Sequence, residues 1–148
     1  MVPENSENAG PRLSGLRCLV VDDTQLNRLA AQKILTFEGA RVTLAVDGKQ
    51  AIQFLRAEPR GFDVVFMDVQ MPVMDGLSAT RAIRKALGLT DLPVIAWTGE
   101  ALSEQRQKAR EAGCNGILSK PVDLNELVAT LILHLDISSG LASSINGA

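Results

Sequence analysis

Five short apolar runs, separated by longer amphipathic stretches, constrain the fold of this chain more than any other feature of its sequence. Most of the runs are continuous rather than alternating, which is typical of strands buried on both faces of a parallel sheet. The runs are Cys18–Val21, Val42–Val46, Val64–Met67, Val94–Trp97 and Gly116–Leu118. We therefore expect five parallel strands at the centre of the fold.

The stretches that follow these runs have the spacing and the end signals of helices. In the first stretch, Leu26, Ile34 and Phe37 recur at helical spacing, and Gly39 can end the helix. The predicted helices are Thr24–Glu38, Gly48–Ala57, Gly76–Leu87, Ser103–Ala112 and Asp123–His134. Candidate N-cap residues precede or open three of them: Asp47, Asp75 and Asp123, the last with Glu126 at capping-box spacing.

A strand followed by a helix, repeated five times, predicts an α/β fold with a doubly wound parallel sheet and right-handed crossovers. We expect the flavodoxin-like strand order 2-1-3-4-5. The 148 residues, 46% of them hydrophobic, suffice for one core. The predicted domain covers residues 16–135, between a polar N-terminal tail (1–15) and a polar C-terminal tail (136–148) that is too short for an output domain.

Charge and composition exclude several classes of function. A net charge of −2 gives no basic field for nucleic acid or for an anionic membrane, and aromatic residues at 3% give no stacking platform. The sequence has no apolar run long enough to span a bilayer, so we expect a soluble, cytoplasmic protein. Cys18 and Cys114 lack CxxC spacing and are expected to be reduced, buried thiols.

Polar residues end four of the five predicted strands. Asp22 and Asp23 end the first, Asp68 the third, Thr98 the fourth and Lys120 the fifth. In open α/β sheets, ligands bind beyond the carboxyl ends of the strands at the switch point, and the order 2-1-3-4-5 brings the first and third strands together there. Three adjacent carboxylates repel, so one pKa should rise unless a cation is present; magnesium suits such oxygen ligands.

The amino-acid sequence around these strand ends resembles the receiver domain of two-component response regulators, in particular receivers of hybrid histidine kinases. The resemblance covers about residues 16–135 and rests on four motifs in order. They are Leu19–Asp23, Val65–Gly76, the strand end at Thr98, and Ser119–Lys120–Pro121. It implies a phosphorylation switch that catalyses only its own phosphorylation and dephosphorylation, and is not otherwise an enzyme.

The resemblance assigns a role to each site residue. Asp68 would accept a phosphoryl group from a phosphohistidine on a histidine kinase or a histidine phosphotransfer protein. Mg²⁺ would be held by Asp23 and Asp68 directly, by Asp22 mainly through water, and by the backbone carbonyl of Gln70. Lys120 and Thr98, named above, would contact the phosphoryl oxygens, and the peptide bond after Lys120 would be cis.

Three positions affect the lifetime of the phosphoryl group and the signal that it produces. In this family the residues two beyond the acceptor and two beyond the threonine set the hydrolysis rate; here they are Gln70 and Glu100. Receivers often couple the threonine to an aromatic residue three before the lysine, but Ile117 stands there, so we expect the switch of Thr98 and Ile117 to signal differently or more weakly. Trp97, the only tryptophan, is expected to pack in the core beside the site.

Three other functions are alternatives to this one. A phosphatase with an aspartate nucleophile would need DxDxT, but Gln70 stands where its general acid should be. A flavin module would need a Ser/Thr/Gly-rich phosphate loop, and Asp22-Asp23-Thr24-Gln25 is acidic. A phosphorylation-independent pseudo-receiver is opposed by the retained site residues. The sequence also allows a weak homodimer.

Overall fold

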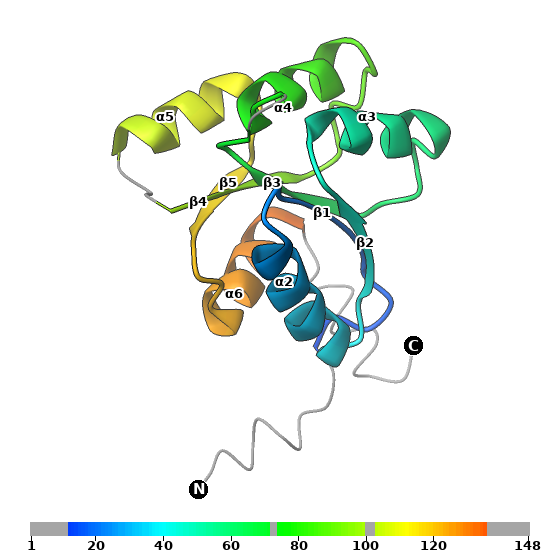
Figure 1. Ribbon diagram of the computed structural model, residues 1–148, viewed down its shortest axis with the longest axis vertical. Coiled ribbons are helices and arrows are strands. Elements are labelled where there is room, and N and C mark those ends of the chain that lie inside the picture. Colours follow the sequence, from blue (N-terminus) through cyan, green and yellow to red (C-terminus); the bar gives the residue numbers. More distant parts are fainter. Residues whose placement is uncertain (1–11, 72–73, 100–102, 136–148) are drawn as a thin grey trace, which may run out of the picture.

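A five-stranded parallel sheet forms the middle layer of the protein (Figure 1). The computed structural model describes residues 12–71, 74–99 and 103–135 of the chain. The strands are β1 (Arg17–Val21), β2 (Arg41–Ala45), β3 (Val64–Asp68), β4 (Val94–Thr98) and β5 (Gly116–Ser119). Their order is β2-β1-β3-β4-β5, which confirms the predicted topology and places β1 beside β3 at the centre.

Five helices cover the two faces of this sheet. They are α2 (Gln25–Phe37), α3 (Gly48–Ala57), α4 (Gly76–Lys85), α5 (Ser103–Ala112) and α6 (Leu124–Leu135). Helices α3, α4 and α5 pack on one face, and α2 and α6 pack on the other, so the described residues form three layers (Figure 1). The helices α3 and α5 have the predicted bounds, and the others differ from prediction by one or two residues at an end.

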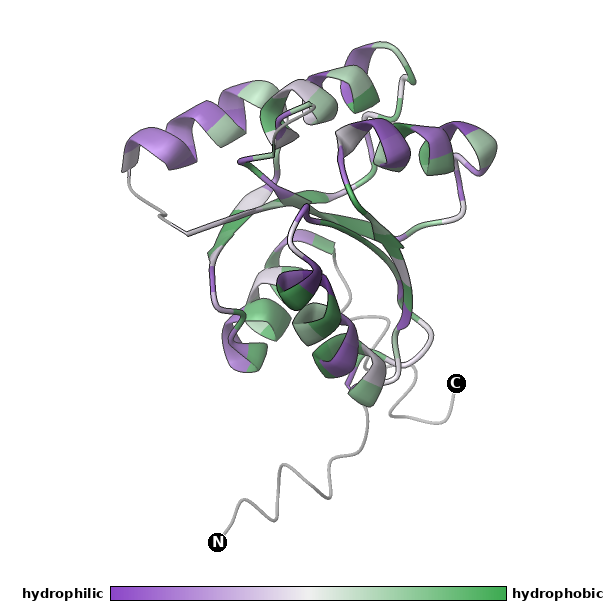
Figure 2. Ribbon diagram, viewed as in Figure 1, coloured by the Kyte–Doolittle hydropathy of each residue, from purple (hydrophilic) through white to green (hydrophobic). Residues whose placement is uncertain are grey.

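The core lies on both sides of the sheet, as the continuous apolar runs predict. Along β3, Val64 and Phe66 face the α2 and α6 side, and Val65 and Met67 face α3, α4 and α5; all four are at most 1% exposed. Figure 2 shows the hydrophobic residues concentrated on the strands and on the helix faces toward them. The sheet is therefore buried on both faces, and its ligand-accessible positions are the strand ends.

Helix α4 ends two residues before the predicted Leu87. The Leu87 N–H donates to the carbonyl of Ala82 and the Leu89 N–H to that of Ile83, so the regular hydrogen-bond ladder stops after Ala86. Gly88 follows with φ of +68°, a left-handed conformation that glycine adopts without steric cost. The apolar spacing of the sequence continues past the point where the backbone hydrogen bonds change.

The segment before β1 packs against the turn between α2 and β2. Leu13, within the predicted polar tail, is 1% exposed and joins the α2 and α6 side of the core. Its N–H donates to the Glu38 carbonyl at 2.8 Å, and Arg12 donates to the Glu38 carboxylate. In the part of the chain that the structure describes, no helix is both long enough and apolar enough to cross a bilayer.

Candidate functional site

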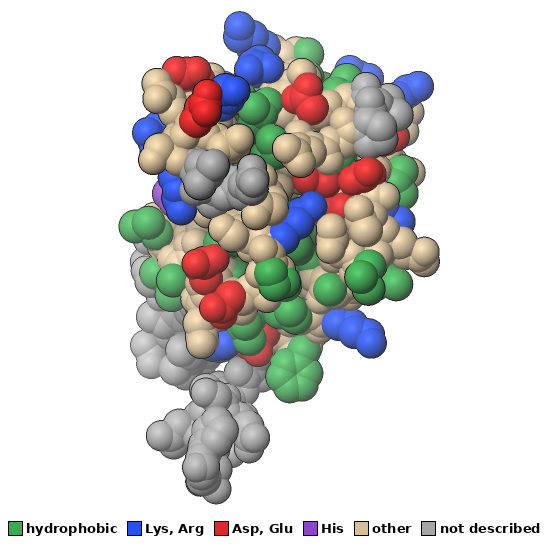
Figure 3. Space-filling model, turned by 60° about the vertical axis from the view of Figure 1, so that its left-hand side comes forward, with side chains coloured by type: hydrophobic (Ala, Val, Ile, Leu, Met, Phe, Trp, Pro, Cys, Tyr) green, Lys and Arg blue, Asp and Glu red, His purple; other side chains and the backbone are tan. Residues whose placement is uncertain are grey.

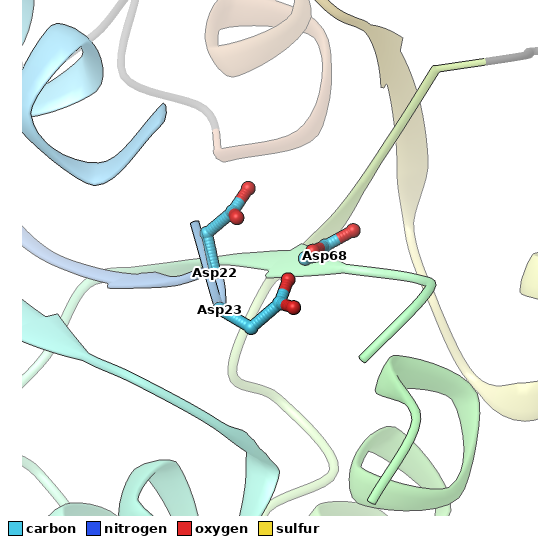
Figure 4. Close-up of side chains that lie close together, drawn as sticks. All are labelled: Asp22, Asp23 and Asp68. Carbon is cyan, nitrogen blue, oxygen red and sulfur yellow. The ribbon is translucent and has the colours of Figure 1, made fainter. Parts of the chain in front are cut away.

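Three aspartates meet at the carboxyl ends of the two central strands. Asp22 and Asp23 follow β1 directly, and Asp68 is the last residue of β3. Because Val21 of β1 is in register with Met67 of β3, the three side chains share one edge of the sheet (Figure 4). One carboxylate oxygen from each lies within 4.8 Å of the others, and Asp23 alone is exposed. The predicted convergence of these residues is present in the structure.

The first turn of α2 holds Asp22 in place. The Thr24 N–H donates to Asp22 Oδ1 at 2.8 Å, and the Asn27 amide reaches the same oxygen at 3.5 Å. Arg28 Nη1 donates to the Asp22 backbone carbonyl at 2.6 Å. Our predictions from the sequence assign Asn27 and Arg28 no role at the site. Such a role could be predicted from their place in the first two turns of a helix that starts beside Asp22.

Lys120 supplies the positive charge of the site. Its Nζ lies 2.8 Å from Asp22 Oδ2 and 3.2 Å from Asp68 Oδ1, so it bridges two of the three carboxylates. The Lys120 backbone N–H donates to the carbonyl of Thr98 at 2.8 Å, which ties the β5 end to the β4 end. The Lys120–Pro121 bond is cis, as predicted.

Burial and neighbouring charge shift the protonation equilibria here. Desolvation, and then repulsion from Asp22, raise the pKa of Asp68 to about 6, although Lys120 opposes this shift. Burial on its own lowers the pKa of Lys120, but ion pairs with the two carboxylates outweigh it and the net shift is upward. The site therefore has a cationic lysine and a carboxylate whose charge is only partly compensated.

The remaining predicted residues surround this centre. Thr98 is the last residue of β4, next to β3, and is 3% exposed. The Gln70 N–H donates to Asp68 Oδ1 at 3.2 Å, and Gln70 itself is exposed beside the acceptor. Ile117 pairs with Ala96 and packs toward α3, α4 and α5. Glu100 lies outside the described residues.

The donors present fit a hard divalent cation. All three acidic side chains offer oxygen, the atom type that magnesium prefers. Asp68 Oδ2 is buried and has no hydrogen-bond partner among the described residues, so a ligand for that oxygen is missing from the protein itself. On the surface, acidic side chains gather around one point with a basic side chain beside them (Figure 3).

The cysteines lie apart from this centre. Cys18 and Cys114 are both free and buried, as predicted. Burial raises the pKa of the Cys18 thiol to about 12 and also raises that of Cys114. Both side chains therefore remain protonated and pack as small apolar groups.

A parallel sheet of this order, with an acidic triad at its central strand ends and a lysine that reaches the triad from the end of β5, defines a receiver-type α/β domain. A family profile described as the response regulator receiver domain matches residues 18–132. The chain therefore belongs to the response regulator receiver domain family, the phosphorylation switches of two-component signalling.

Several relatives carry this domain within histidine kinases. The chain is 42% identical over 118 residues to the sensor histidine kinase RcsC of Salmonella typhi, covering 80% of this chain and 12% of that protein. It is 36% identical over 122 residues to the osmosensing histidine protein kinase SLN1 of Saccharomyces cerevisiae, covering 80% and 10%. Among the first curated relatives, the chain spans only 5% to 16% of the relative's length.

Solved structures agree with the fold. The receiver domain of the sensor histidine kinase PA1611 from Pseudomonas aeruginosa has a TM-score of 0.73 and 37% identity, covering 83% of this chain and 99% of that one. The chemotaxis protein CheY4 of Vibrio cholerae has a TM-score of 0.75 and 32% identity, covering 82% and 100%. A receiver domain of a sensor histidine kinase and a chemotaxis protein are thus both among its structural neighbours.

Proposed function

We propose that the protein accepts a phosphoryl group on Asp68 in a magnesium-dependent reaction and acts as a switch or relay in a phosphorelay. The observation that carries this proposal is the convergence of the Asp22, Asp23 and Asp68 carboxylates with the Lys120 ammonium at the central strand ends. Each of these groups has a use in phosphoryl transfer. The proteins of similar structure support the same reaction, since they include a receiver of a histidine kinase and a chemotaxis protein.

The reaction needs one bond to form and one to break. A carboxylate oxygen of Asp68 attacks the phosphorus of a phosphohistidine, and the phosphorus–nitrogen bond breaks to release the donor's imidazole. Since the pKa of Asp68 is about 6, the carboxylate is mostly ionised at neutral pH and needs no base. The transition state spreads charge over the equatorial phosphoryl oxygens, so electrostatic stabilisation and positioning provide most of the catalysis.

The protein's own residues would divide this work. Asp22, Asp23, Asp68 and the Gln70 carbonyl would hold the metal, and Lys120 would move from its carboxylate partners to a phosphoryl oxygen. Magnesium, when bound, supplies positive charge that offsets the charge on the phosphoryl oxygens. A magnesium ion lies in the active-site cleft of the Pseudomonas aeruginosa receiver, which supports the same ion for this chain.

The signalling step would run through Thr98. A phosphoryl group on Asp68 would draw the Thr98 hydroxyl toward it, and the segment leading to α5 would follow. Because Ile117 lacks a ring that could rotate with Thr98, the β5 surface would change less than in receivers with an aromatic residue there. Gln70 and Glu100 would set the hydrolysis rate, since polar side chains at both positions can contact the attacking water.

The phosphodonor would be a histidine kinase or a histidine phosphotransfer protein. The identity to RcsC and SLN1 favours a receiver that works within or beside a hybrid kinase. We further propose that it acts in the cytoplasm and self-associates at most as a weak homodimer.

Replacing Gln70 and Glu100 together and timing the loss of the phosphoryl group tests their proposed role in setting the hydrolysis rate. An unchanged decay rate rejects that role.

The decisive experiment is incubation with acetyl phosphate, with and without magnesium, followed by intact-mass and peptide mass spectrometry. We expect one added phosphoryl group, located on Asp68, only when magnesium is present. Asp68→Asn should remain unmodified, and Ser78→Ala, which removes a half-buried hydroxyl that donates to Asp75 at the start of α4, should be modified like the wild type. Magnesium-independent or absent modification would contradict the proposal and favour a pseudo-receiver, and turnover of small phosphoesters would favour a phosphatase.

A further inference from the structure

Trp97 lies against the ammonium group of the site. Lys120 Nζ is 5.9 Å from the centroid of the Trp97 ring, within the range of a cation–π contact. The indole is 3% exposed and the Lys120 side chain 20% exposed, so both groups are largely shielded from solvent. Such contacts are stronger when both groups are shielded from solvent.

The sheet register places this ring beside the acceptor. Trp97 is opposite Asp68 on one side and Leu118 on the other. Paired residues of neighbouring parallel strands point to the same face, and Trp97 packs in the core layer shared with α2 and α6. Trp97 Nε1 is buried and has no hydrogen-bond acceptor among the described residues. No hydrogen bond of the indole therefore fixes the ring, and its identified polar contact is the one with Lys120.

We infer that Trp97 is a positioning residue for phosphoryl transfer, acting through Lys120. This inference rests on the proposed function, in which Lys120 leaves its carboxylate partners for a phosphoryl oxygen. A metal ion bound to the carboxylates would compete with Lys120 for Asp22 and Asp68, and both ion pairs would weaken. The ring of Trp97 has no part in metal binding, so it keeps the ammonium over the pocket while its anionic partners change.

Three substitutions separate this role from ordinary packing. Trp97→Phe keeps an aromatic face, whereas Trp97→Leu and Trp97→Met fill similar space without one. Each is made in the wild type and in the Lys120→Met background, and the rate of Asp68 modification by acetyl phosphate is measured at saturating magnesium. Magnesium affinity is measured separately by calorimetry, and folding by urea denaturation. If one of the two variants without an aromatic ring does not fold, the other takes its place.

We expect Trp97→Leu to lower the modification rate about threefold to tenfold, and Trp97→Phe to lower it less than about twofold. Magnesium affinity should stay the same in both. In the Lys120→Met background, which is itself slow, Trp97→Leu should have no further effect. Equal losses for Leu and Phe, or an equal Leu effect in both backgrounds, would overturn the inference and leave the proposed function intact.

The failure of the proposed function has a different signature. A wild-type protein that is not modified at Asp68 would remove the basis of both proposals, whereas a Lys120→Met variant that reacts as fast as the wild type would overturn the inference alone. The contact itself has a spectroscopic readout because Trp97 is the only tryptophan. Lys120→Met should change its emission, and Lys108→Met, which removes an exposed lysine of α5, should not. Unchanged emission in Lys120→Met would also overturn the inference.

Discussion

The Asp68 carboxylate is 3% exposed and lies beside Asp22, so the folded protein disfavours its ionised form. Its pKa is about 6 in the fold and 3.8 ordinarily. Between these values the folded state binds more protons than the unfolded state, and the free energy of unfolding therefore falls as the pH rises from about 4 to about 6. Above that window the ionised carboxylate costs stability, which is a common property of functional sites.

Asp68→Asn should therefore stabilise the metal-free protein at neutral pH. We expect its free energy of unfolding to exceed that of the wild type by about 2 kcal/mol at pH 7.5 in the presence of a chelator, because the uncompensated charge is removed. The gain should disappear below about pH 4, where the wild-type carboxyl is protonated in both states. Urea denaturation at both pH values measures this, and a variant less stable than the wild type at pH 7.5 would contradict it.

At the scale of elements, the first residue of α4 packs against the backbone of the acceptor. The Gly76 N–H donates to the Val69 carbonyl at 3.0 Å, which turns the chain directly after Asp68. A Cβ at Gly76 would lie 2.0 Å from the Asp68 carbonyl oxygen and 2.8 Å from its carbon. Both obstructing atoms are backbone, so a side chain at Gly76 would require Asp68 or the start of α4 to move.

Gly76→Ala should accordingly destabilise the fold by about 3 kcal/mol or more, in the range of severe overpacking. Gly99→Ala is the matched control, because a Cβ there meets nothing within 4 Å. Urea denaturation of both variants gives the comparison. If the two glycine variants lost similar stability, the close approach at Gly76 would not be the cause.

Arg84 connects α4 to the two loops that lead into β4 and β5. Its guanidinium donates to the carbonyls of Gly113, Leu89 and Leu92 and to Asn115 Oδ1, at distances from 2.5 to 3.0 Å. Lysine has one nitrogen and cannot serve acceptors spread over several segments. One side chain therefore donates hydrogen bonds to acceptors in both loops.

Arg84→Lys should lower the free energy of unfolding by about 2 kcal/mol, because partly buried carbonyls lose their donors. Arg81→Lys makes the same change one turn earlier, at an exposed position, and should be nearly neutral. Thermal or urea unfolding of the pair measures the difference. Equal stability of the two variants would show that the hydrogen bonds of Arg84 contribute nothing net.

These elements also show what sequence reasoning can and cannot reach. The strands and the acidic strand ends followed from continuous apolar runs and from the rule that parallel strands end at one edge. The contacts of Arg84, and that of Arg12 with the buried Glu38, join residues distant in sequence, and no local pattern signals them. The end of α4 was missed because apolar spacing persists after Ala86 while the backbone hydrogen bonds change.

For the molecule as a whole, folding and metal binding should be linked. The three carboxylates come together only when β1 and β3 pair, so the unfolded chain lacks the site. A ligand that binds only the folded state stabilises it by RT ln(1 + [L]/Kd). Any cation held at this site therefore stabilises the entire sheet, including strands that never contact it.

Magnesium should thus raise the free energy of unfolding by about 2.7 kcal/mol at a concentration one hundred times its Kd. Asp23→Asn should abolish most of this gain. Because Asp23 is exposed, the substitution should barely change stability without metal. Asp91→Asn, at an exposed position on the loop before β4, should keep the full gain. Urea denaturation at a series of magnesium concentrations measures how the free energy of unfolding of each variant depends on magnesium. An equal magnesium response in Asp23→Asn and Asp91→Asn would place the ion elsewhere on the protein.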